Sequence, residues 1–417
     1  MESKRVVITG LGAITPIGNT VKDFWKGLVN GKNGAGEITR FDSSLFKTRF
    51  ACEVKDYDPE VYFEKKDVRK YDHFAQFALI AADEAIADSG ISAENCDLDE
   101  VGVMMTSGIG GVNHLFNEVM EYAQTDLTPR FSPFLITKMI INSPGGVISI
   151  KYGFRGPNFA TVSACASSTH AIIEAFNYIR LGKCQAVVAG GARAAIGTLG
   201  IGGFNSMKAL STRNDDPMTA SRPFDLNRDG FVMGEGAGCL ILEEYEHAIA
   251  RGAKIYAELV GGGASADAYH ITAPHPEGKG GILSMQRALK DAEIAPEAID
   301  HINTHGTSTP AGDVAEPIAI KEVFGEHAYN ISINSTKSMT GHLLGGAGAV
   351  EAIACVLALK NGIVPPTINH FDDDPQIDNR LDFTFHKARH RDINYALSNS
   401  VGFGGQNATL IFKKFQS

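Results

Sequence analysis

The chain has 417 residues, of which 44% are hydrophobic and 21% charged, a balance typical of a folded globular protein with a large core. Its formal net charge of −10 argues against a general affinity for nucleic acid or anionic membranes. The six cysteines include no Cys-x-x-Cys pair, so neither a disulfide framework nor a structural zinc site is predicted, and a reducing cytoplasm is expected.

Predicted strands and helices alternate along the chain. Apolar runs predict strands over residues 4–18, 101–111, 185–192, 238–244, 254–268, 301–307 and 330–337, and a hairpin over 395–412. Apolar residues at helical spacing predict helices over residues 71–89, 245–253, 281–292 and 345–360, and another that ends before Gly182. The alternation predicts an α/β fold with mostly buried sheets. We expect no signal peptide and no membrane insertion, because the N-terminus predicts a strand and the longest apolar run carries Arg193.

Cys165 lies where a short buried strand, predicted over residues 158–164, meets a predicted helix. A helix start presents free N–H groups and partial positive charge, which should lower the pKa of the thiol and favour the nucleophilic thiolate. Ala164 and Ala166 leave room for a substrate. Since a lone cysteine is more often a core residue, other residues must decide its role.

The region around Cys165 has a counterpart later in the chain. Residues 162–183 and 335–362 share the order of strand, small polar turn, apolar helix, basic residue and glycine. This similarity predicts two related halves, residues 1–255 with the nucleophile and cap insertions, and residues 256–417. A pseudo-symmetric pairing of the halves would bring Cys165 and His342 to one central seam.

Two histidines, His305 and His342, stand in glycine-punctuated turns, and Lys337 precedes the second. Two neutral imidazoles can both donate N–H to one enolate oxygen, and a nearby lysine keeps them from taking up protons. This arrangement suits carbon–carbon bond formation with a decarboxylated malonyl unit, whereas a cysteine hydrolase needs one histidine as its base. The glycine-rich turn over residues 398–408 could supply a second oxyanion donor beside Cys165.

Five ordered segments carry a resemblance to a known family: ACASSTHA, GFVMGEGAG, HGTSTPAGD, STKSMTGHLLG and SNSVGFGGQNATL. They resemble the signatures of the β-ketoacyl-[acyl-carrier-protein] synthases, above all the type II enzymes that elongate bacterial fatty acids. The resemblance covers essentially the whole chain. It implies a thiolase-like fold, with duplicated αβαβα halves in five layers with mixed sheets, and a cytoplasmic homodimer.

The resemblance also implies the roles of individual residues. Cys165 would accept the acyl group from the carrier protein. His305 and His342 would promote decarboxylation of the malonyl unit and hold the enolate, with Lys337 and Glu351 supporting them. The expected reaction is a decarboxylating condensation that gives a 3-oxoacyl carrier two carbons longer and CO2.

The implied oxyanion hole uses the N–H groups of Cys165 and Phe403, with Phe403 also at the family's gate position. Ile109 and Val401 are expected at the acyl pocket. Three residues depart from the family pattern: Val401 replaces a phenylalanine, Gln406 a threonine and Gly346 an alanine. The smaller side chain at Val401 predicts altered chain-length or malonyl-binding behaviour.

No cofactor is required for this chemistry, because both substrates are carried on the phosphopantetheine of acyl-carrier protein. A structural monovalent cation is implied at Asn303, Glu316, Glu351, Ser398 and Asn399. Acyl-carrier proteins are acidic, so docking is predicted at basic residues. The basic residues considered are Lys65, Lys66, Arg69, Lys70, Arg130, Lys138, Lys208 and Arg213.

Other functions fit the sequence less well. The turn GLGAITPIG weakly resembles a dinucleotide-binding loop, but Pro16 stands where the helix should begin and the third glycine is misplaced. A cysteine hydrolase would release free acid without malonyl-carrier protein, and a non-catalytic chain-length factor would usually lack the nucleophile. A ketosynthase of a polyketide or aryl-polyene pathway stays open as an alternative.

Overall fold

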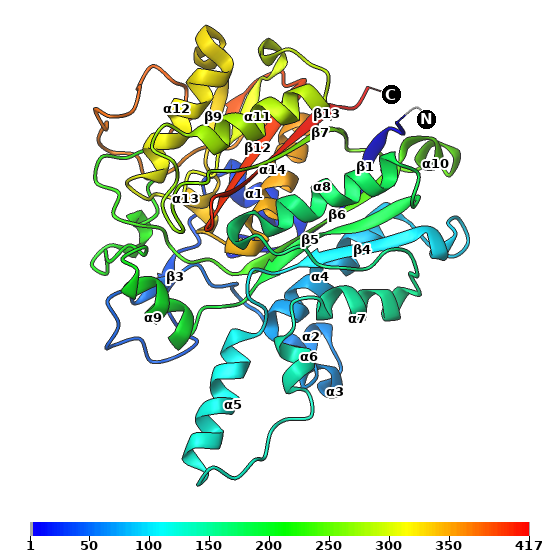
Figure 1. The fold of residues 1–417 in the computed structure, drawn as a ribbon, viewed down its shortest axis with the longest axis vertical. Helices are drawn as coiled ribbons and strands as arrows, with labels where there is room; N and C mark the ends of the chain where they lie inside the picture. The colour runs from blue at the N-terminus through cyan, green and yellow to red at the C-terminus, as the bar shows by residue number, and fades with distance from the viewer. Residues whose placement is uncertain (1–2, 417) are drawn as a thin grey trace.

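The computed structural model describes residues 3–416, which form one large mixed sheet covered by helices (Figure 1). Its nine strands have the order β4-β5-β6-β1-β7-β13-β12-β8-β9. They are β1 (Val6–Ile14), β4 (Val101–Thr106), β5 (Ala186–Arg193), β6 (Gly236–Glu244), β7 (Ala257–Ala266), β8 (His301–Asn303), β9 (Ser332–Asn334), β12 (Tyr395–Gly402) and β13 (Gln406–Lys414). Two small sheets pair β2 (Gly36–Glu37) with β3 (Phe50–Ala51) and β10 (Ile363–Val364) with β11 (Arg389–His390).

The α-helices of the described residues differ widely in length. They are α1 (Val21–Val29), α2 (Pro59–Tyr62), α3 (Lys65–Val68), α4 (His73–Ser89), α5 (Val112–Gln124), α6 (Leu135–Met139), α7 (Ser143–Tyr152), α8 (Ser167–Arg180), α9 (Thr198–Ser206), α10 (Tyr245–Ala250), α11 (Lys279–Asp291), α12 (Gly312–Phe324), α13 (Lys337–Thr340) and α14 (Ala347–Asn361). The helices predicted over residues 71–89, 245–253, 281–292 and 345–360 are confirmed as α4, α10, α11 and α14.

The large sheet consists of two halves that share a pattern of four strands, and β9 adds a fifth strand to the second half. In the first half β6 runs antiparallel to β1 and β5, and β4 lies parallel to β5. In the second half β13 runs antiparallel to β7 and β12, and β8 lies parallel to β12. Only a short antiparallel pairing, Val6–Ile8 with Ala257–Leu259, joins the halves through β1 and β7. The matching pattern confirms the predicted duplication of the fold.

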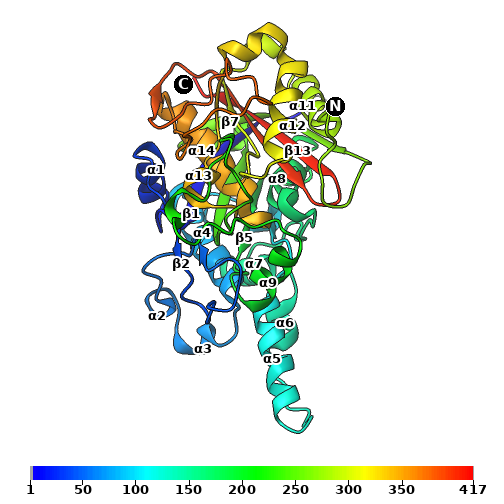
Figure 2. The ribbon, with the colours of Figure 1, turned by 90° about the vertical axis from the view of Figure 1, so that its left-hand side faces the viewer.

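Helices and the two half-sheets stack in five layers (Figures 1 and 2). Helices α4 and α7 pack on the outer face of the first half, and α11 packs on the outer face of the second, with α12 beside it. Helices α8 and α14 lie between the halves and contact both. Because α14 is enclosed on all sides, nearly all of its residues are apolar.

The predicted α/β, thiolase-like architecture is therefore confirmed. One helix of the described residues, Leu344–Asn361, is apolar and long enough to cross a membrane, but 89% of it is buried inside the protein. Such burial is what a core helix between two sheets requires.

The strand predicted over residues 158–164 is absent from the structure. This segment makes a single parallel bridge, Asn158 to Val103, at the free edge of β4. Val162 is 55% exposed, so the segment is not buried either. An edge position leaves a β-like sequence without a second partner strand, which explains the failed prediction.

Two other predicted strands are shorter than expected. Strands β8 and β9 have three residues each, whereas runs of 301–307 and 330–337 were predicted. The backbone N–H groups of His305 and Gly306 donate to the Glu316 carboxylate, so they cannot pair with a neighbouring strand. Lys337 begins α13. The residues that follow the two shortened strands, among them His305 and Lys337, belong to the candidate site.

Helix α5, with α6 beside it, projects from the body as an arm (Figures 1 and 2). None of the α5 residues is buried. The arm exposes large apolar side chains, namely those of Val119, Met120, Leu127, Phe131 and Ile136. Such a concentration of exposed apolar groups marks an interaction surface.

Candidate active site

The turn that carries Cys165 has a strained backbone. A 3₁₀ turn over Ala164–Ala166 precedes α8, and Ala164 has a φ of +50°. A non-glycine residue in this left-handed region is uncommon, and such strain persists where surrounding contacts enforce it. Here the Ser167 hydroxyl donates to the Ala164 carbonyl at 2.7 Å, and the Ser163 N–H donates to the same hydroxyl at 2.9 Å. The turn is thereby fixed with Cys165 at its centre.

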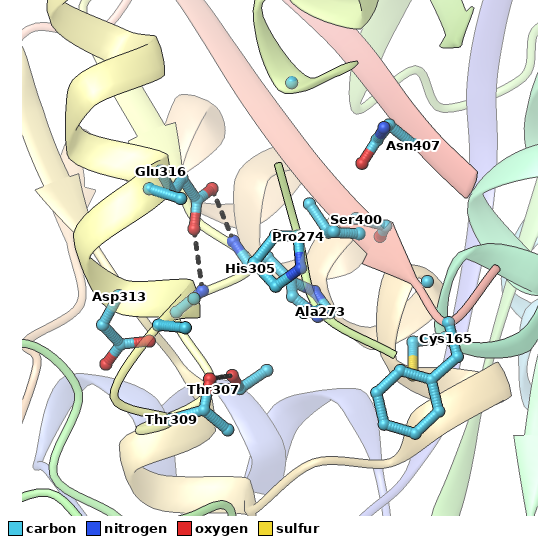
Figure 3. A pocket seen from close by; sticks show the side chains of 18 of the residues that line it. Cys165, Ala273, Pro274, His305, Thr307, Thr309, Asp313, Glu316, Ser400 and Asn407 are labelled. Carbon is cyan, nitrogen blue, oxygen red and sulfur yellow. Dashed lines mark hydrogen bonds between the residues drawn. The ribbon is translucent and has the colours of Figure 1, made fainter. Parts of the chain in front are cut away.

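Cys165 lines a cavity of about 500 Å³ together with His305, His342, Val401 and Phe403. Figure 3 shows Cys165 and His305 on the wall of this cavity, at the ends of elements from the two halves of the chain. With Lys208, Glu316 and Asn399, which also line it, the structure brings eight predicted site residues to one space. Cys165 is 6% exposed, so it is enclosed yet lines the cavity.

The two histidines form a close pair. Their ring centroids lie 5.2 Å apart with the planes nearly perpendicular, at 86°. His342 Nδ1 accepts the N–H of Leu344 at 3.3 Å, which assigns the proton of the neutral ring to Nε2. Burial first and Lys337 second hold the pKa of both histidines well below the usual value. At neutral pH both rings are therefore uncharged and can each donate one N–H.

Lys337 and Glu351 form a fully buried ion pair beneath the histidines. Burial raises the pKa of the Glu351 carboxyl, and Lys337 opposes this rise. The pair carries no net charge, but the positive charge of Lys337 acts to lower the pKa of both histidines and of Cys165. These contacts fit the supporting position that the family resemblance implies.

The lowered pKa expected for the Cys165 thiol is not found. Burial raises its pKa to about 11, while Lys337, Arg193 and the Phe403 N–H act in the opposite direction. Helix α8 begins only at Ser167, after the 3₁₀ turn, so the thiol lies outside the helix and burial dominates. The Phe403 N–H hydrogen bonds to the Cys165 side chain, so one predicted oxyanion donor does lie beside the sulfur.

Other predicted site residues lie elsewhere. Ile109 is 45% exposed and is not part of the cavity wall. Among the predicted docking residues, Lys208 alone lines the cavity, and it is exposed at its surface. Lys65, Lys66 and Lys70 each pair with a nearby carboxylate, at 3.6, 2.7 and 2.8 Å. Their charge is therefore largely compensated within the chain.

Several acceptors at the predicted cation position have no partner among residues 3–416. These buried atoms are Asn303 Oδ1, Glu351 Oε2 and Ser398 Oγ. Glu316 accepts an N–H from Asn399 at 3.3 Å, and burial raises the pKa of this carboxyl to about 7. The same residues include no cluster of three His, Cys, Asp or Glu side chains suited to a metal ion.

Sequence reasoning missed three parts of the site. The hydroxyls of Thr307 and Thr309 lie 3.0 Å apart on the cavity wall (Figure 3). The Phe231 ring packs edge-on against His342, with centroids 5.3 Å apart. Arg193, the last residue of β5, is buried near Cys165. The only signal for Arg193 was its presence at the end of an otherwise apolar strand.

The chain matches known sequences over its whole length. Residues 3–248 match the "Beta-ketoacyl synthase, N-terminal domain" and residues 256–371 the "Beta-ketoacyl synthase, C-terminal domain". The chain is 52% identical to the 3-oxoacyl-[acyl-carrier-protein] synthase 2 of Synechocystis sp., over 100% of this chain and 99% of that protein. It is 49% identical to the Coxiella burnetii protein of the same name, over 99% of each chain.

Solved structures give the same result. A ketosynthase bound to the hexaketide, in complex with its type II PKS acyl-carrier protein, superposes with a TM-score of 0.92 at 35% identity, over 99% of this chain and 100% of that one. A beta-ketoacyl synthase from Burkholderia phymatum gives a TM-score of 0.91 at 35% identity, with the same coverage. With Cys165 and two neutral histidines around one cavity, and with relatives aligned from end to end, this chain belongs to the beta-ketoacyl synthase family.

Proposed function

We propose that the chain catalyses the decarboxylating condensation of an acyl group with malonyl-[acyl-carrier protein] in fatty-acid elongation. In the first half-reaction the Cys165 thiolate attacks the carbonyl carbon of the acyl thioester. The N–H groups of Cys165 and Phe403 hold the resulting oxyanion. The bond from that carbon to the pantetheine sulfur then breaks, and the carrier leaves as a thiolate. This thiolate takes up from solvent the equivalent of the proton that the Cys165 thiol released.

In the second half-reaction the malonyl unit loses CO2. The electron pair of the broken carbon–carbon bond passes into an enolate, whose oxygen accepts N–H bonds from His305 and His342. The enolate carbon attacks the Cys165 thioester, and the sulfur leaves as a thiolate. The product is a 3-oxoacyl carrier two carbons longer. The threonine hydroxyls at positions 307 and 309 offer the pantetheine arm polar partners along the cavity wall.

One observation carries this proposal: two uncharged imidazoles, 5.2 Å apart, share a cavity with a cysteine. A hydrolase needs one of them to accept a proton, but burial and Lys337 make protonation of both unfavourable. Neutral rings serve better as paired donors to a developing enolate.

The test uses acyl-carrier proteins of graded chain length. Intact mass should show one acyl group on wild-type protein and none on Cys165→Ala. Adding malonyl-carrier protein should then release CO2 and give a 3-oxoacyl carrier. Free fatty acid formed without malonyl-carrier protein would indicate a hydrolase instead.

A ketosynthase of a polyketide pathway is the second possibility, because a ketosynthase in complex with a type II PKS acyl-carrier protein superposes on nearly the whole chain. The identity of 35% to it is lower than the 52% to a 3-oxoacyl-[acyl-carrier-protein] synthase 2. Repeated condensation without reduction, giving poly-β-keto products on one carrier, would favour this second function.

Acyl-carrier protein is the expected partner, and Lys208 is our first choice for its docking. This lysine is exposed and lines the cavity, so an acidic carrier bound there could pass its arm directly to Cys165. Lys208→Glu should raise the KM for acyl-carrier protein several-fold. An unchanged KM would exclude this residue.

A homodimer is the second assembly that we propose. The exposed apolar arm around α5 and the segment 158–164 at the free edge of β4 both offer surface that a second copy could cover. Light scattering should give twice the chain mass for the wild type. The variant Val162→Asp, at the exposed edge, should favour the monomer.

A monovalent cation would fit the unpartnered oxygens of Asn303, Glu351 and Ser398, with Glu316 and Asn399 beside them. An oxygen-only donor set suits a hard cation, which here would neutralise buried carboxylate charge and link β8, β12 and α14. We also infer that residues 1–255 and 256–417 are the two halves of one catalytic unit. The six cysteines, all free, suit work in the reducing cytoplasm.

A further inference from the structure

Arg193 is the bulkiest fully buried side chain of the described residues, and it is 2% exposed. It ends β5, where its backbone pairs with Gly236. Its guanidinium reaches the Cys165 turn: a Cβ placed on Gly108 would lie 3.2 Å from Arg193 Nη1 and 3.6 Å from the Ala164 carbonyl oxygen. A large cation therefore lies buried directly beside the turn that carries the nucleophile.

This cation has no counter-charge among residues 3–416. Arg193 forms no ion pair there, and its Nε is buried without an acceptor. A buried charge without a partner is unfavourable because it has lost its hydration. Every other buried arginine in the described part of the chain, Arg222 and Arg228, has a carboxylate partner.

The other ionisable groups near Cys165 do not supply a counter-charge for Arg193. Lys337 and Glu351 neutralise each other, and both active-site histidines are uncharged. His170, on α8, is bound to the Ser163 hydroxyl at 2.7 Å, and burial lowers its pKa. Besides Arg193, the titratable groups that act on the Cys165 thiol are Lys337 and Glu351. The cavity that the thiol lines also holds Lys208, Asp267, His275, His305, Asp313, Glu316 and His342.

We propose that Arg193 is a positioning residue for catalysis, whose buried guanidinium stabilises the Cys165 thiolate through space. The thiolate is the counter-charge that the guanidinium otherwise lacks. Burial lowers the pKa of Arg193 to about 10, so the guanidinium is still charged at neutral pH and the stabilisation is present there. This stabilisation offsets part of the free-energy cost of burying the thiolate. It disappears once the sulfur is acylated and neutral.

The consequence is a difference between the two half-reactions. Formation of the acyl-enzyme requires the thiolate and should depend on Arg193. Decarboxylation of malonyl-carrier protein occurs while the sulfur is a neutral thioester and should depend on Arg193 much less. This inference rests on the proposed role of Cys165 as the nucleophile.

The test measures the pH dependence of Cys165 alkylation by iodoacetamide, followed by intact mass. The comparison uses wild type, Arg193→Met and Arg193→Lys, with Cys165→Ala as the blank for the other cysteines. The midpoint for Arg193→Met should rise by roughly one pH unit, as expected for loss of a nearby opposite charge. The midpoint for Arg193→Lys should lie close to the wild-type value, because the lysine keeps the positive charge. At pH 7 the rate of acyl-enzyme formation should fall about tenfold in Arg193→Met and recover at high pH.

Lys290→Met is the matched control, because it removes one exposed positive charge from α11 and should leave the midpoint unchanged. If Arg193→Met does not fold, Arg193→Gln replaces it. A folded Arg193→Met or Arg193→Gln protein with the wild-type midpoint would overturn the proposal, whatever its thermal stability. Alkylation needs no acyl or malonyl substrate, so failure of this inference is distinguishable from failure of the proposed reaction.

Discussion

Two turns in the central layer have the same geometry but different contents. The turn Ala164–Ala166 leads into α8, and the turn Leu344–Gly346 leads into α14. The first residue of each has left-handed backbone, with φ of +50° at Ala164 and +49° at Leu344. By position Cys165 in the first turn corresponds to Gly345 in the second. A Cβ at Gly345 would overlap the backbone nitrogen of Gly108.

The comparison shows how a duplicated frame becomes an asymmetric site. The first turn has room for a side chain and holds the sulfur at a cavity. The second turn is packed so closely that only glycine fits, and it supports the first. The second half instead supplies the donors, because His305 follows β8 and His342 follows α13. Changes in the two halves should therefore affect different steps.

The largest effect is expected for Cys165→Ala in the first turn. Loss of the nucleophile should reduce condensation by at least about 10³-fold, while the fold and the histidine pair persist. The assay follows 3-oxoacyl-carrier formation and the mass of the protein. CO2 release from malonyl-carrier protein should remain measurable. Acylation of another residue in Cys165→Ala would contradict the assignment.

The histidines of the second half should show the opposite pattern. His305→Ala and His342→Ala should each lower condensation by about 10²- to 10³-fold, since each removes a donor from the enolate oxygen. Acyl-enzyme should still form on Cys165 in both variants. Rapid-quench mass spectrometry separates the two steps. A variant that loses acylation but keeps decarboxylation would reverse the proposed division of roles.

The site follows from the sequence only in part. Cys165, His305 and His342 were predictable because each stands in a turn of glycines and small residues between regular elements. Phe403 was named from the family resemblance, although its glycine-rich turn already predicted an oxyanion donor. Long apolar runs such as β5 and β6 were predictable because their side chains are buried on both faces.

The features that the sequence did not predict depend on tertiary packing. Residues 158–164 read as a strand, but at the free edge of β4 they make only one bridge, from Asn158 to Val103. Helix α12 was not predicted, and it contains Pro317, which normally argues against a helix. The pKa of Cys165 depends on how deeply the turn is enclosed, and Arg193 becomes notable only when its lack of a partner is seen.

The neutral histidines predict a pH-dependent stability. Their folded pKa values lie below the unfolded value of about 6.5, so the stability that they contribute is full above that pH and is lost as pH falls. Below pH 6.5 each should steepen the decline in the free energy of unfolding by about 1.4 kcal/mol per pH unit. Thermal midpoints of wild type and His305→Gln/His342→Gln between pH 6.5 and 5 measure this slope.

His301 provides the matched control for that slope. It is a third buried histidine, in β8, whose pKa burial lowers to about 4. His301→Gln should therefore remove about half as much of the pH dependence as the double variant. Parallel curves for wild type and the double variant would show that the active-site rings are protonated in the folded protein.

Gly345→Ala tests the packing of the second turn. The added methyl would overlap the backbone beside Ser107 and Gly108, so the free energy of unfolding should fall by about 1–3 kcal/mol. Gly146→Ala, in α7, is the control, because a Cβ there meets no atom within 4 Å. It should leave the thermal midpoint unchanged or raise it. Equal midpoints for both variants would show that the second turn has room for a side chain after all.

The smallest effect is expected at Val401, where the first and second halves meet at the cavity. Val401 lines the wall near Phe403, and its side chain is smaller than the family's usual phenylalanine. Val401→Phe should fill part of the space and shift kcat/KM toward shorter acyl chains by several-fold, as a change in pocket volume of a few methylenes allows. Val401→Ile, which adds one methylene, should shift the profile less. Identical acyl profiles for wild type and Val401→Phe would show that the valine does not shape the pocket.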